Sequence, residues 1–424
     1  MTLLAIFIAL VFLHSLVSGR LERTVVTTPI LFTTAGLLVL LLLPELRERM
    51  VNPEVFRRIA EVGLVLLLFT DASRTNLQML KSIRNLPVRL LSTGMLLTIL
   101  LGALAALAVF PQLTLWEAGI LAAILAPTDA GLGQVIVNSP RVPMRIRQAL
   151  NVEAGLNDGL SVPFLLFFIG LADASADGQR ASFTRFIVEQ LGYGTLIGVG
   201  IGLAGGWLLG VAHRRKWTAH SWQQLGVVAL PAFCAVASEA VGASMFIAAF
   251  VAGLAVQVGF KEAGEHSVEF TEEWGQLLNL SVFFIFGLLV ARDWQHFTAA
   301  LVLYAVLSLT VVRMFPVAIA LMGTRLSRAT LLFMGWFGPR GLASIVLAMV
   351  YLEHGKQHPG EDTIRLAVMV TVLLSIFAHG LSAVPGIELY SRKIRILPAS
   401  AMELEGVPEK LVGENAIGVM QTKH

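Results

Sequence analysis

Apolar stretches long enough to cross a lipid bilayer recur along almost the whole chain, and they constrain its fold more than any other feature. A helix needs about 20 mostly apolar residues to cross the hydrocarbon core. Thirteen such stretches are found, at residues 2–19, 28–44, 55–73, 86–110, 115–138, 145–173, 184–213, 220–240, 242–258, 269–291, 296–323, 330–353 and 362–385. The sequence therefore predicts an all-α integral membrane protein with about 13 transmembrane helices in residues 1–390 and a short tail at 391–424.

The composition agrees with a membrane protein. Of the 424 residues, 56% are hydrophobic and 14% are charged, whereas a soluble globular protein carries roughly 25% charged residues. This excludes a soluble enzyme and a disordered chain, and the single cysteine, Cys234, excludes a disulfide scaffold. A net charge of +3 is too small for nucleic-acid binding, so no nucleic-acid partner is expected.

The distribution of basic residues predicts the orientation in the membrane. Lys and Arg favour cytoplasmic loops, and one set of alternate loops carries eighteen of them while the other carries nine. Arg20 and Arg23 follow the first apolar stretch instead of preceding it, which favours a retained helix over a cleaved signal peptide. We expect the N-terminus outside and the C-terminal tail in the cytoplasm.

Two of the apolar stretches are interrupted near their middles. The fifth contains Ala126-Pro-Thr-Asp-Ala-Gly-Leu-Gly133, and the twelfth contains Gly338-Pro-Arg-Gly341. Proline and glycine break helices, and the freed backbone groups survive at that depth only when they are buried in protein or line a cavity. The breaks lie seven stretches apart, so a duplicated half would be inverted. This arrangement predicts two inverted repeats whose interrupted helices, the fifth and twelfth, cross at a midplane substrate site.

The sixth stretch carries two acids, Glu153 and Asp158, with Asn157 between them. At about 100° per residue, Glu153 and Asn157 share a helix face, whereas Asp158 lies about 140° from Glu153. The two acids are therefore expected to have different partners. We predict that Glu153 pairs with Arg340 of the twelfth stretch, aided by Asn157.

Asp158 is then left to face the interrupted fifth stretch, where Thr128, Asp129 and unwound carbonyls supply further oxygens. Oxygen ligands without Cys or His suit a hard cation, and one or two acids fit a monovalent ion better than calcium. An aspartate in such a cavity holds either a proton or a cation, which is enough to couple their flows. In the alternative interpretation, Asp129 and Asp158 are structural acids that accept hydrogen bonds from helix ends.

Other ionisable residues are assigned weaker roles. Asp71, at the end of the third stretch, is either a water-bridged pathway acid or an interfacial residue. Three charged residues near helix ends or glycines are expected at solvated or interfacial positions: Glu61, Glu239 and Arg313. His14 and His379 are lone histidines in apolar segments, where packing with satisfied ring nitrogens is favoured over a proton relay.

Several segments, in this order, resemble the monovalent cation/proton antiporter family that includes the NhaP-type sodium/proton exchangers of bacteria and archaea. They are Phe69–Arg74, Ala126–Ala130, Glu153–Gly159, Glu239–Gly253 and Gly338–Leu342. The resemblance implies ion coordination by Thr128, Asp129 and Asp158, with Asp71 contributing through water. It also implies that Glu153, Asn157 and Arg340 form a structural ion-pair network.

The resemblance further implies exchange of a monovalent cation (Na⁺, with Li⁺ or K⁺ as alternatives) for a proton by alternating access, without a cofactor. Asn157 directly before Asp158 implies electroneutral one-for-one exchange. The implied protein is a homodimer in the bacterial or archaeal inner membrane, with core helices at 55–173 and 269–385 and scaffold helices at 1–44 and 184–258. One departure is Ala154, where members often have a hydroxyl ligand, and this leaves the choice of cation open.

In the seventh stretch, five glycines recur at strict four-residue intervals: Gly194, Gly198, Gly202, Gly206 and Gly210. Small residues at this spacing allow close helix packing in lipid, either across a dimer seam or within one protomer.

Two rival functions are considered. An intramembrane aspartyl protease would use Asp129 and Asp158 as its dyad, but the Gly-x-Gly-Asp signature is absent from the sequence. A cation channel would show a pore loop, and none is visible.

Overall fold

The computed structural model describes residues 2–21, 24–49, 53–74, 86–177, 184–186, 188–260, 267–354, 358–398 and 401–404. Within these ranges all regular secondary structure is helical, and this confirms the predicted all-α class. The first part of the chain forms α1 (Thr2–Leu21), α2 (Thr28–Leu42), the 3₁₀ turn η1 (Pro44–Arg49), α3 (Pro53–Arg74), and the continuous segments α5 (Pro87–Arg89), η2 (Leu90–Gly94) and α6 (Met95–Val109).

The next elements include the first interrupted helix and the 34-residue helix α9. They are α7 (Leu115–Ile124), α8 (Ala130–Val137), α9 (Met144–Asp177), the π-turn η3 (Val188–Tyr193), α11 (Gly194–Arg214), α12 (His220–Val241) and α13 (Met245–Gly259). The chain ends with α14 (Ser267–Asp293), η5 (Trp294–His296), α15 (Ala299–Leu309), α16 (Val311–Ala320), α17 (Arg328–Trp336), α18 (Leu342–His354) and α19 (Glu361–Ile394).

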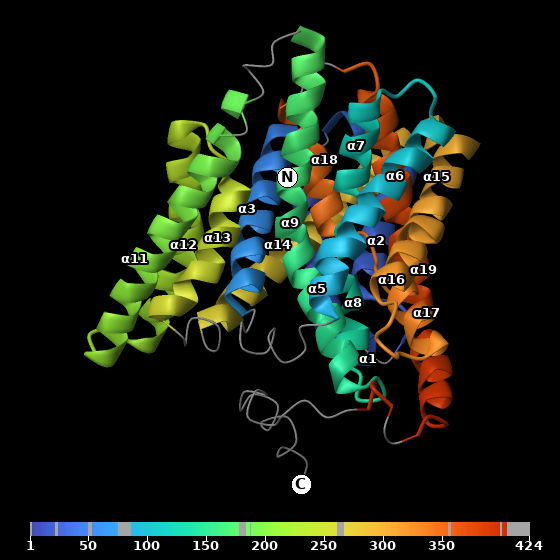
Figure 1. Cartoon of the computed structure of the whole chain (residues 1–424). Helices are drawn as coiled ribbons and strands as arrows, with labels where there is room; N and C mark the ends of the chain where they lie inside the picture. The colour runs from blue at the N-terminus through green and yellow to red at the C-terminus, as the bar shows by residue number, and fades with distance from the viewer. Residues whose placement is uncertain are drawn as a thin grey trace.

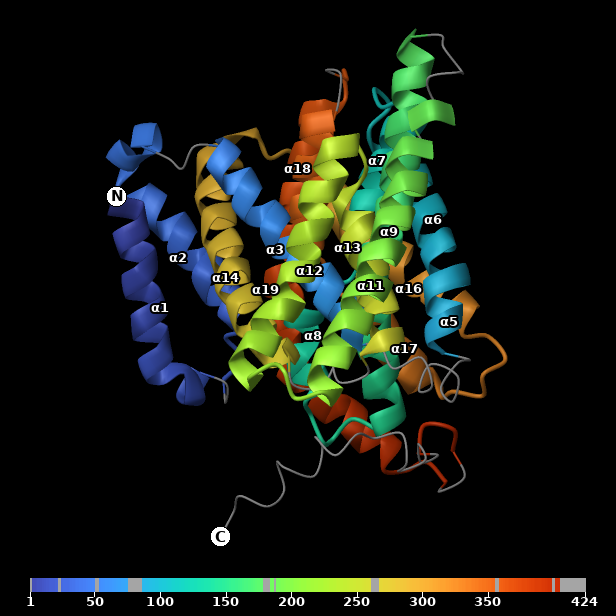
Figure 2. The same cartoon turned by 90° about the vertical axis from the view of Figure 1, so that its left-hand side faces the viewer.

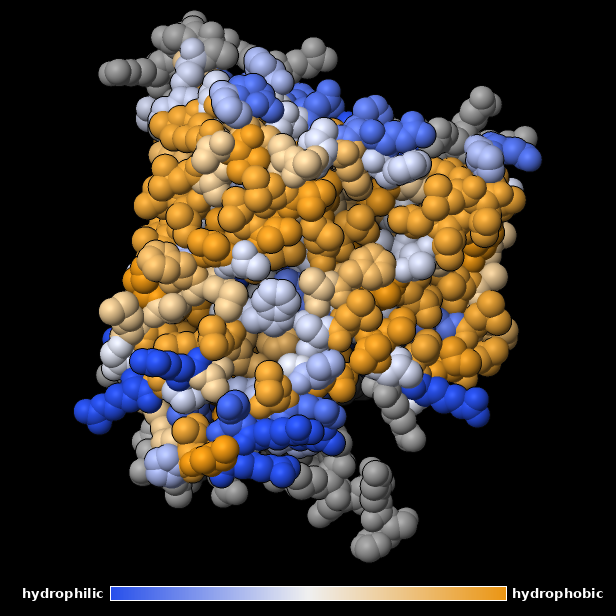
Figure 3. All heavy atoms as spheres, turned by 90° about the vertical axis from the view of Figure 1, so that its right-hand side faces the viewer, coloured by the Kyte–Doolittle hydropathy of each residue, from blue (hydrophilic) through white to orange (hydrophobic). Residues whose placement is uncertain are grey.

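Each predicted apolar stretch contains one helix or two helices in tandem. Eight helical segments among the described residues are long and apolar enough to cross a bilayer alone, and four shorter apolar helices accompany them. On the face shown in Figure 3, a broad band of apolar side chains lies between two polar ends. The first residues of α1 lie near one end and the last described residues near the other (Figure 2). The chain is therefore a multi-pass membrane protein.

The helices form two lateral groups with shared helices between them. In Figure 1, α11–α13 lie on one side of the molecule and α6, α15, α16 and α19 on the other, with α3, α9 and α14 in between. Helices α7 and α18 lie inside, where Ile120, Ile124 and Val346 are fully buried, and the non-helical residues 125–129 and 337–341 are buried as well. This arrangement places both helix breaks away from lipid.

The glycine stripe of α11 is buried within the protomer. A Cβ atom at Gly206 would lie 2.4 Å from the carbonyl oxygen of Val256, and one at Gly202 would lie 2.7 Å from that of Ala252. Glycine therefore lets the α11 backbone approach α13 directly. Of the two roles left open for the stripe, packing within one protomer is the one that the structure confirms.

Within the described part of the tail, Glu403 makes a buried contact. Glu403 lies beside the first turn of α17, where its Oε1 accepts hydrogen bonds from the Ser327 backbone N–H (2.6 Å) and the Thr330 hydroxyl (2.9 Å). Thr330 also bonds the hydroxyl of Tyr390 on α19 (3.0 Å). The chain beyond α19 thus returns to one end of the interrupted helix.

Candidate functional site: the crossing of two interrupted helices

The two predicted interruptions meet in space. Non-helical backbone at 125–129 separates α7 from α8, and non-helical backbone at 337–341 separates α17 from α18. The Asp129 N–H donates to the Pro339 carbonyl oxygen (2.8 Å). Glycine is required beside this contact, because a Cβ atom at Gly341 would lie 2.0 Å from Asp129 Oδ2. The structure therefore joins the fifth and twelfth apolar stretches directly, as predicted.

Asp129 stabilises the starts of two helices at once. Its Oδ1 accepts the Leu132 N–H (2.9 Å) as the N-cap of α8, and its Oδ2 accepts the Leu342 N–H (2.7 Å) at the start of α18. Helix N-termini carry partial positive charge and unpaired N–H groups, which favour a carboxylate there. The interpretation of Asp129 as an acid that accepts hydrogen bonds from helix ends is confirmed.

Arg340 stabilises the carboxyl end of a helix, that of α7. Its Nη1 donates to the carbonyl oxygens of Ala126 and Pro127, each at 3.0 Å, just beyond the end of α7. The Ser344 hydroxyl donates to the Ile124 carbonyl oxygen (2.8 Å). The Arg340 side chain is fully buried, so these bonds pair carbonyls that the break removed from the α7 helix.

The predicted ion pair between Glu153 and Arg340 is wrong. Glu153 Oε1 instead accepts from Nη1 of Arg313 on α16, at 2.6 Å, and both side chains are buried. The assignment of Arg313 to an interfacial position is also wrong, as is that of Glu61, which is buried. Arg313 reaches the crossing because α16 packs against the second break, where a Cβ atom at Gly338 would lie 2.3 Å from Arg313 Nε.

A sequence signal for Arg313 was present. The residue lies near the middle of the 296–323 apolar stretch, and a charge at that depth needs a buried partner. The structure adds that α15 ends and α16 begins around Thr310, so this helix is broken as well. Nothing in the sequence distinguishes Arg313 from Arg340 as the partner of Glu153, since both are single cations in apolar stretches.

Asn157 also has a different partner from the one predicted. Its Nδ2 donates to the hydroxyl of Thr128 (2.7 Å) and so orients a predicted ligand. The two acids differ in their direct partners, as expected: Glu153 pairs with Arg313, whereas Asp158 has Asp129 and Asp71 as electrostatic neighbours. Arg340 interacts electrostatically with both acids.

Asp158 lies on α9 with only 3% of its surface exposed. Its Oδ1 is buried and accepts no hydrogen bond from the part of the chain that the structure describes. The neighbouring Gly159 packs against the ring of Phe250 on α13, where any side chain would collide. A buried carboxylate oxygen without a donor costs free energy unless a proton or a cation satisfies it.

Asp71 is held close to the same helix. A Cβ atom at Gly155, one turn before Asp158, would lie 3.5 Å from the Asp71 Cβ. On α13, Gln257 donates to the Ala72 carbonyl oxygen (2.9 Å) and thereby fixes the end of α3. Asp71 thus faces α9, as a pathway acid would.

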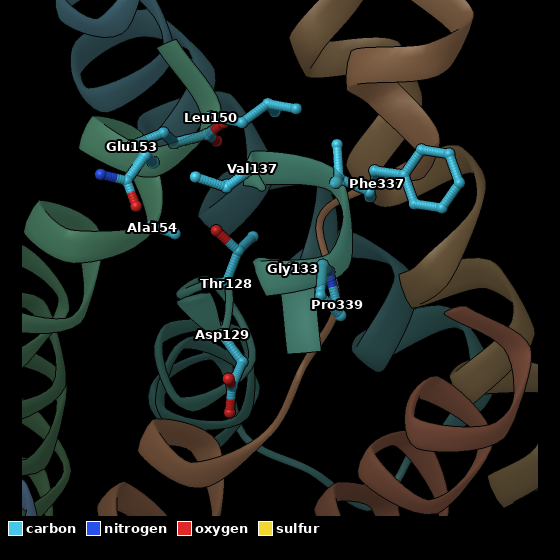
Figure 4. Close-up of a pocket in the computed structure, with 11 residues that line it drawn as sticks. Thr128, Asp129, Gly133, Val137, Leu150, Glu153, Ala154, Phe337 and Pro339 are labelled. Carbon is cyan, nitrogen blue, oxygen red and sulfur yellow. The ribbon is translucent and has the colours of Figure 1, made fainter. Parts of the chain in front are cut away.

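A small cavity reaches the crossing (Figure 4). Its volume is about 20 Å³, enough for a single water molecule. Its polar lining residues are Thr128, Asp129, Asn151 and Glu153, and its apolar ones include Val137, Leu150 and Phe337. It lies toward the start of α9, the same end of the molecule as the tail (Figure 1).

A multi-pass helical protein in which two interrupted helices cross around buried carboxylates has the architecture of a secondary transporter. The match to a family model is consistent with this: residues 5–388 match the model described as "Sodium/hydrogen exchanger, transmembrane". The chain therefore belongs to the sodium/hydrogen exchanger family.

Comparisons with individual proteins agree. The chain is 27% identical over 266 residues to a Na⁺/H⁺ antiporter of Schizosaccharomyces pombe, covering 58% of this chain and 56% of that protein. It is 26% identical over 344 residues to the K⁺/H⁺ antiporter NhaP of Alkalimonas amylolytica, covering 79% of this chain and 57% of that protein. The chain thus spans little more than half the length of these relatives.

The fold is also that of a solved structure. The sodium proton antiporter MjNhaP1 from Methanocaldococcus jannaschii superposes with a TM-score of 0.73 at 19% sequence identity, over 92% of this chain and 99% of that one. The likeness at this identity concerns the fold alone.

Proposed function

We propose that this protein exchanges a monovalent cation for a proton across the membrane, and that Asp158 carries either one. The proposal rests on which of the buried charged side chains have hydrogen-bond partners and which do not. Arg313 is paired with Glu153, and Arg340 donates to backbone carbonyls. Asp158 is the buried acid whose Oδ1 accepts no hydrogen bond within the described ranges.

Competition at one carboxylate couples the two fluxes. A proton on Asp158 neutralises it, and a cation bound there does the same, whereas both together would leave a positive charge in a low-dielectric site. Only protein with a protonated or a cation-bound Asp158, both neutral at this site, can then change between inward- and outward-facing states at a low cost in free energy. Alternating access around the crossing thereby moves one ion for one proton.

The proposed ligands around Asp158 are oxygen atoms. Thr128 supplies a hydroxyl that Asn157 holds in place. Asp129 retains lone pairs in addition to those that accept the two helix N–H groups, and Asp71 contributes through water. We propose Na⁺ as the first ion to test, with Li⁺ and K⁺ beside it, because Ala154 removes one hydroxyl and the named relatives include both Na⁺ and K⁺ antiporters.

The exchange is proposed to be electroneutral. Asn157 is uncharged and bonds Thr128, and Glu153 is neutralised by Arg313. One exchangeable charge then remains, at Asp158, so one monovalent cation replaces one proton. No resident cofactor takes part in this scheme.

We further propose a homodimer in the inner membrane of a bacterium or archaeon, surrounded by lipid, with the N-terminus outside and the tail in the cytoplasm. Core helices at 55–173 and 269–385 would move against scaffold helices at 1–44 and 184–258. The location of the cavity at the end of the molecule that bears the tail supports an inward-facing state.

An aspartyl protease is the weaker candidate, because Asp129 already holds the starts of α8 and α18 and is not free to share a proton with Asp158. The distinguishing experiment is proton flux in proteoliposomes on addition of Na⁺, Li⁺ or K⁺. Asp158→Asn should abolish flux with every cation, while Glu388→Gln, at an exposed acid of α19, should leave it unchanged. Flux retained by folded Asp158→Asn protein would refute the proposal.

A further inference from the structure

Two side chains of α19, Ser375 and His379, contact both sides of the break between α17 and α18. His379 Nε2 lies 2.9 Å from the carbonyl oxygen of Trp336, the last residue of α17. The Ser375 hydroxyl oxygen accepts the Arg340 N–H at 2.6 Å. Both side chains are almost fully buried. The ends of the non-helical segment are thus connected through one turn of a neighbouring, continuous helix.

The partners determine which ring nitrogen of His379 carries hydrogen. A carbonyl oxygen only accepts, so Nε2 carries the hydrogen that is donated to Trp336, whereas Nδ1 lies between the Ser375 carbonyl oxygen (3.0 Å) and the Ser375 hydroxyl, which can donate to it. The Ser375 hydroxyl, which accepts from Arg340, has its own proton left to donate, and His379 Nδ1 lies 3.1 Å away. Neutral His379 therefore completes one chain: Arg340 N–H to Ser375, Ser375 O–H to Nδ1, and Nε2–H to Trp336.

A charged ring fits this environment less well. Protonated Nδ1 would donate to the Ser375 carbonyl oxygen, 3.0 Å away, and the Ser375 hydroxyl would lose its acceptor. Arg340 and Arg313 also interact electrostatically with the ring, so an imidazolium would add a third positive charge beside them. The hydrogen bonds alone suit either form of the ring, and the two arginine charges favour the neutral one.

The segment held in this way positions the Asp129 carboxylate and backbone. The Pro339 carbonyl oxygen accepts the Asp129 N–H, and the Leu342 N–H donates to Asp129 Oδ2. Trp336 is fixed to α19 a second time, because its indole N–H donates to Ser382 (2.9 Å). A shift of residues 337–341 would therefore move Asp129 and the adjoining Thr128.

We infer that His379 and Ser375 are positioning residues for the cation site, and that neutral His379 fixes the α17–α18 break instead of relaying protons. This inference rests on the exchange proposed above. Loss of one such hydrogen bond costs about 0.5–1.5 kcal/mol, which corresponds to a loss of about 2- to 12-fold in affinity.

The first test is kinetic and uses the full chain in proteoliposomes. His379→Leu should raise the KM for the transported cation by about 2- to 12-fold with a smaller change in kcat. His379→Gln, which retains an amide donor for Trp336, should recover much of this affinity and keep the wild-type pH profile. His14→Leu, at a histidine of α1 that lies 3.5 Å from Thr28, is the matched control and should behave as wild type.

The second test is independent of transport. Imidazole ¹⁵N chemical shifts of histidine-labelled protein, assigned by difference from His379→Gln, should show the neutral Nε2–H form throughout the physiological pH range. Titration of His379 in that range, a shifted pH profile in His379→Gln, or a wild-type KM in folded His379→Leu would overturn the inference. Exchange retained by Asp158→Asn would refute the proposed function while leaving the ¹⁵N result intact.

Discussion

At the scale of single residues, the crossing is a set of buried charges that are matched in different ways. Asp129 accepts hydrogen bonds from two helix starts, Arg340 donates to carbonyls beyond a helix end, and Glu153 pairs with Arg313. Asp158, the carrier in the proposed exchange, is the acid of this set whose Oδ1 accepts no hydrogen bond within the described residues. The distinction matters because removal of a structural charge and of the carrier should have different consequences.

Arg313→Ala should destabilise the folded protein strongly. It leaves the Glu153 carboxylate buried without its cation, and loss of one partner of a buried pair costs about 3–5 kcal/mol. Thermal unfolding of purified protein in detergent, followed by tryptophan fluorescence, should show a clearly lower Tm. The double variant Glu153→Gln, Arg313→Met should recover most of the lost Tm, because it removes both charges. An unchanged Tm in Arg313→Ala would contradict the ion pair between Glu153 and Arg313.

At the scale of elements, glycines and caps decide which helices lie together. The α11 stripe brings the α11 backbone against α13, and α13 in turn contacts α3 near Asp71 through Gln257. Close helix approach in lipid depends on small residues, because apolar side chains gain little by leaving an apolar solvent. The packing of α11 on α13 therefore helps to hold α3, and with it Asp71, in place.

Gly206→Ala should weaken this packing, since its Cβ would lie 2.4 Å from the Val256 carbonyl oxygen. Gly200→Ala on the same helix is the control, because its Cβ would meet no atom within 4 Å. We expect a Tm lower by several degrees in the first variant alone. Equal Tm values for the two variants would argue against direct α11–α13 backbone contact.

The Glu403 contact with α17 predicts a pH dependence. Burial raises the pKa of the Glu403 carboxyl, but hydrogen bonds from Ser327 and Thr330 outweigh it and lower the pKa below its usual range. A lowered folded-state pKa means that the charged Glu403 carboxylate stabilises the protein at neutral pH and that this stabilisation is lost as the pH falls through that value.

Glu403→Gln should therefore lower stability at neutral pH by about 1 kcal/mol, because a neutral amide oxygen replaces the charged acceptor of the Ser327 N–H and the Thr330 hydroxyl. The difference from wild type should shrink at strongly acidic pH, where Glu403 is protonated in both states. Thermal unfolding at a series of pH values measures this. A difference that does not change with pH would show that the carboxylate charge does not contribute.

At the scale of the whole molecule, the inverted breaks bring residues from distant parts of the chain to one point within an apolar band (Figure 3). The proposed exchange through a single carboxylate would move no net charge. Voltage-sensitive dye in sealed proteoliposomes should then report no potential during turnover, and clamping the membrane potential should leave the rate unchanged. A potential that builds up with turnover would rule out one-for-one exchange.

The sequence by itself determined the helical membrane class, the positions of the two breaks, and the different surroundings of Glu153 and Asp158. These follow from local properties: the length of apolar runs, the chemistry of proline and glycine, and the helical repeat. Only the tertiary structure decided that Arg313 pairs with Glu153, that Asn157 bonds Thr128, and that the α11 glycines face α13. A buried charge or a small residue signals that a partner is needed, but which partner it finds depends on which helices meet, and that is set by packing of the whole chain.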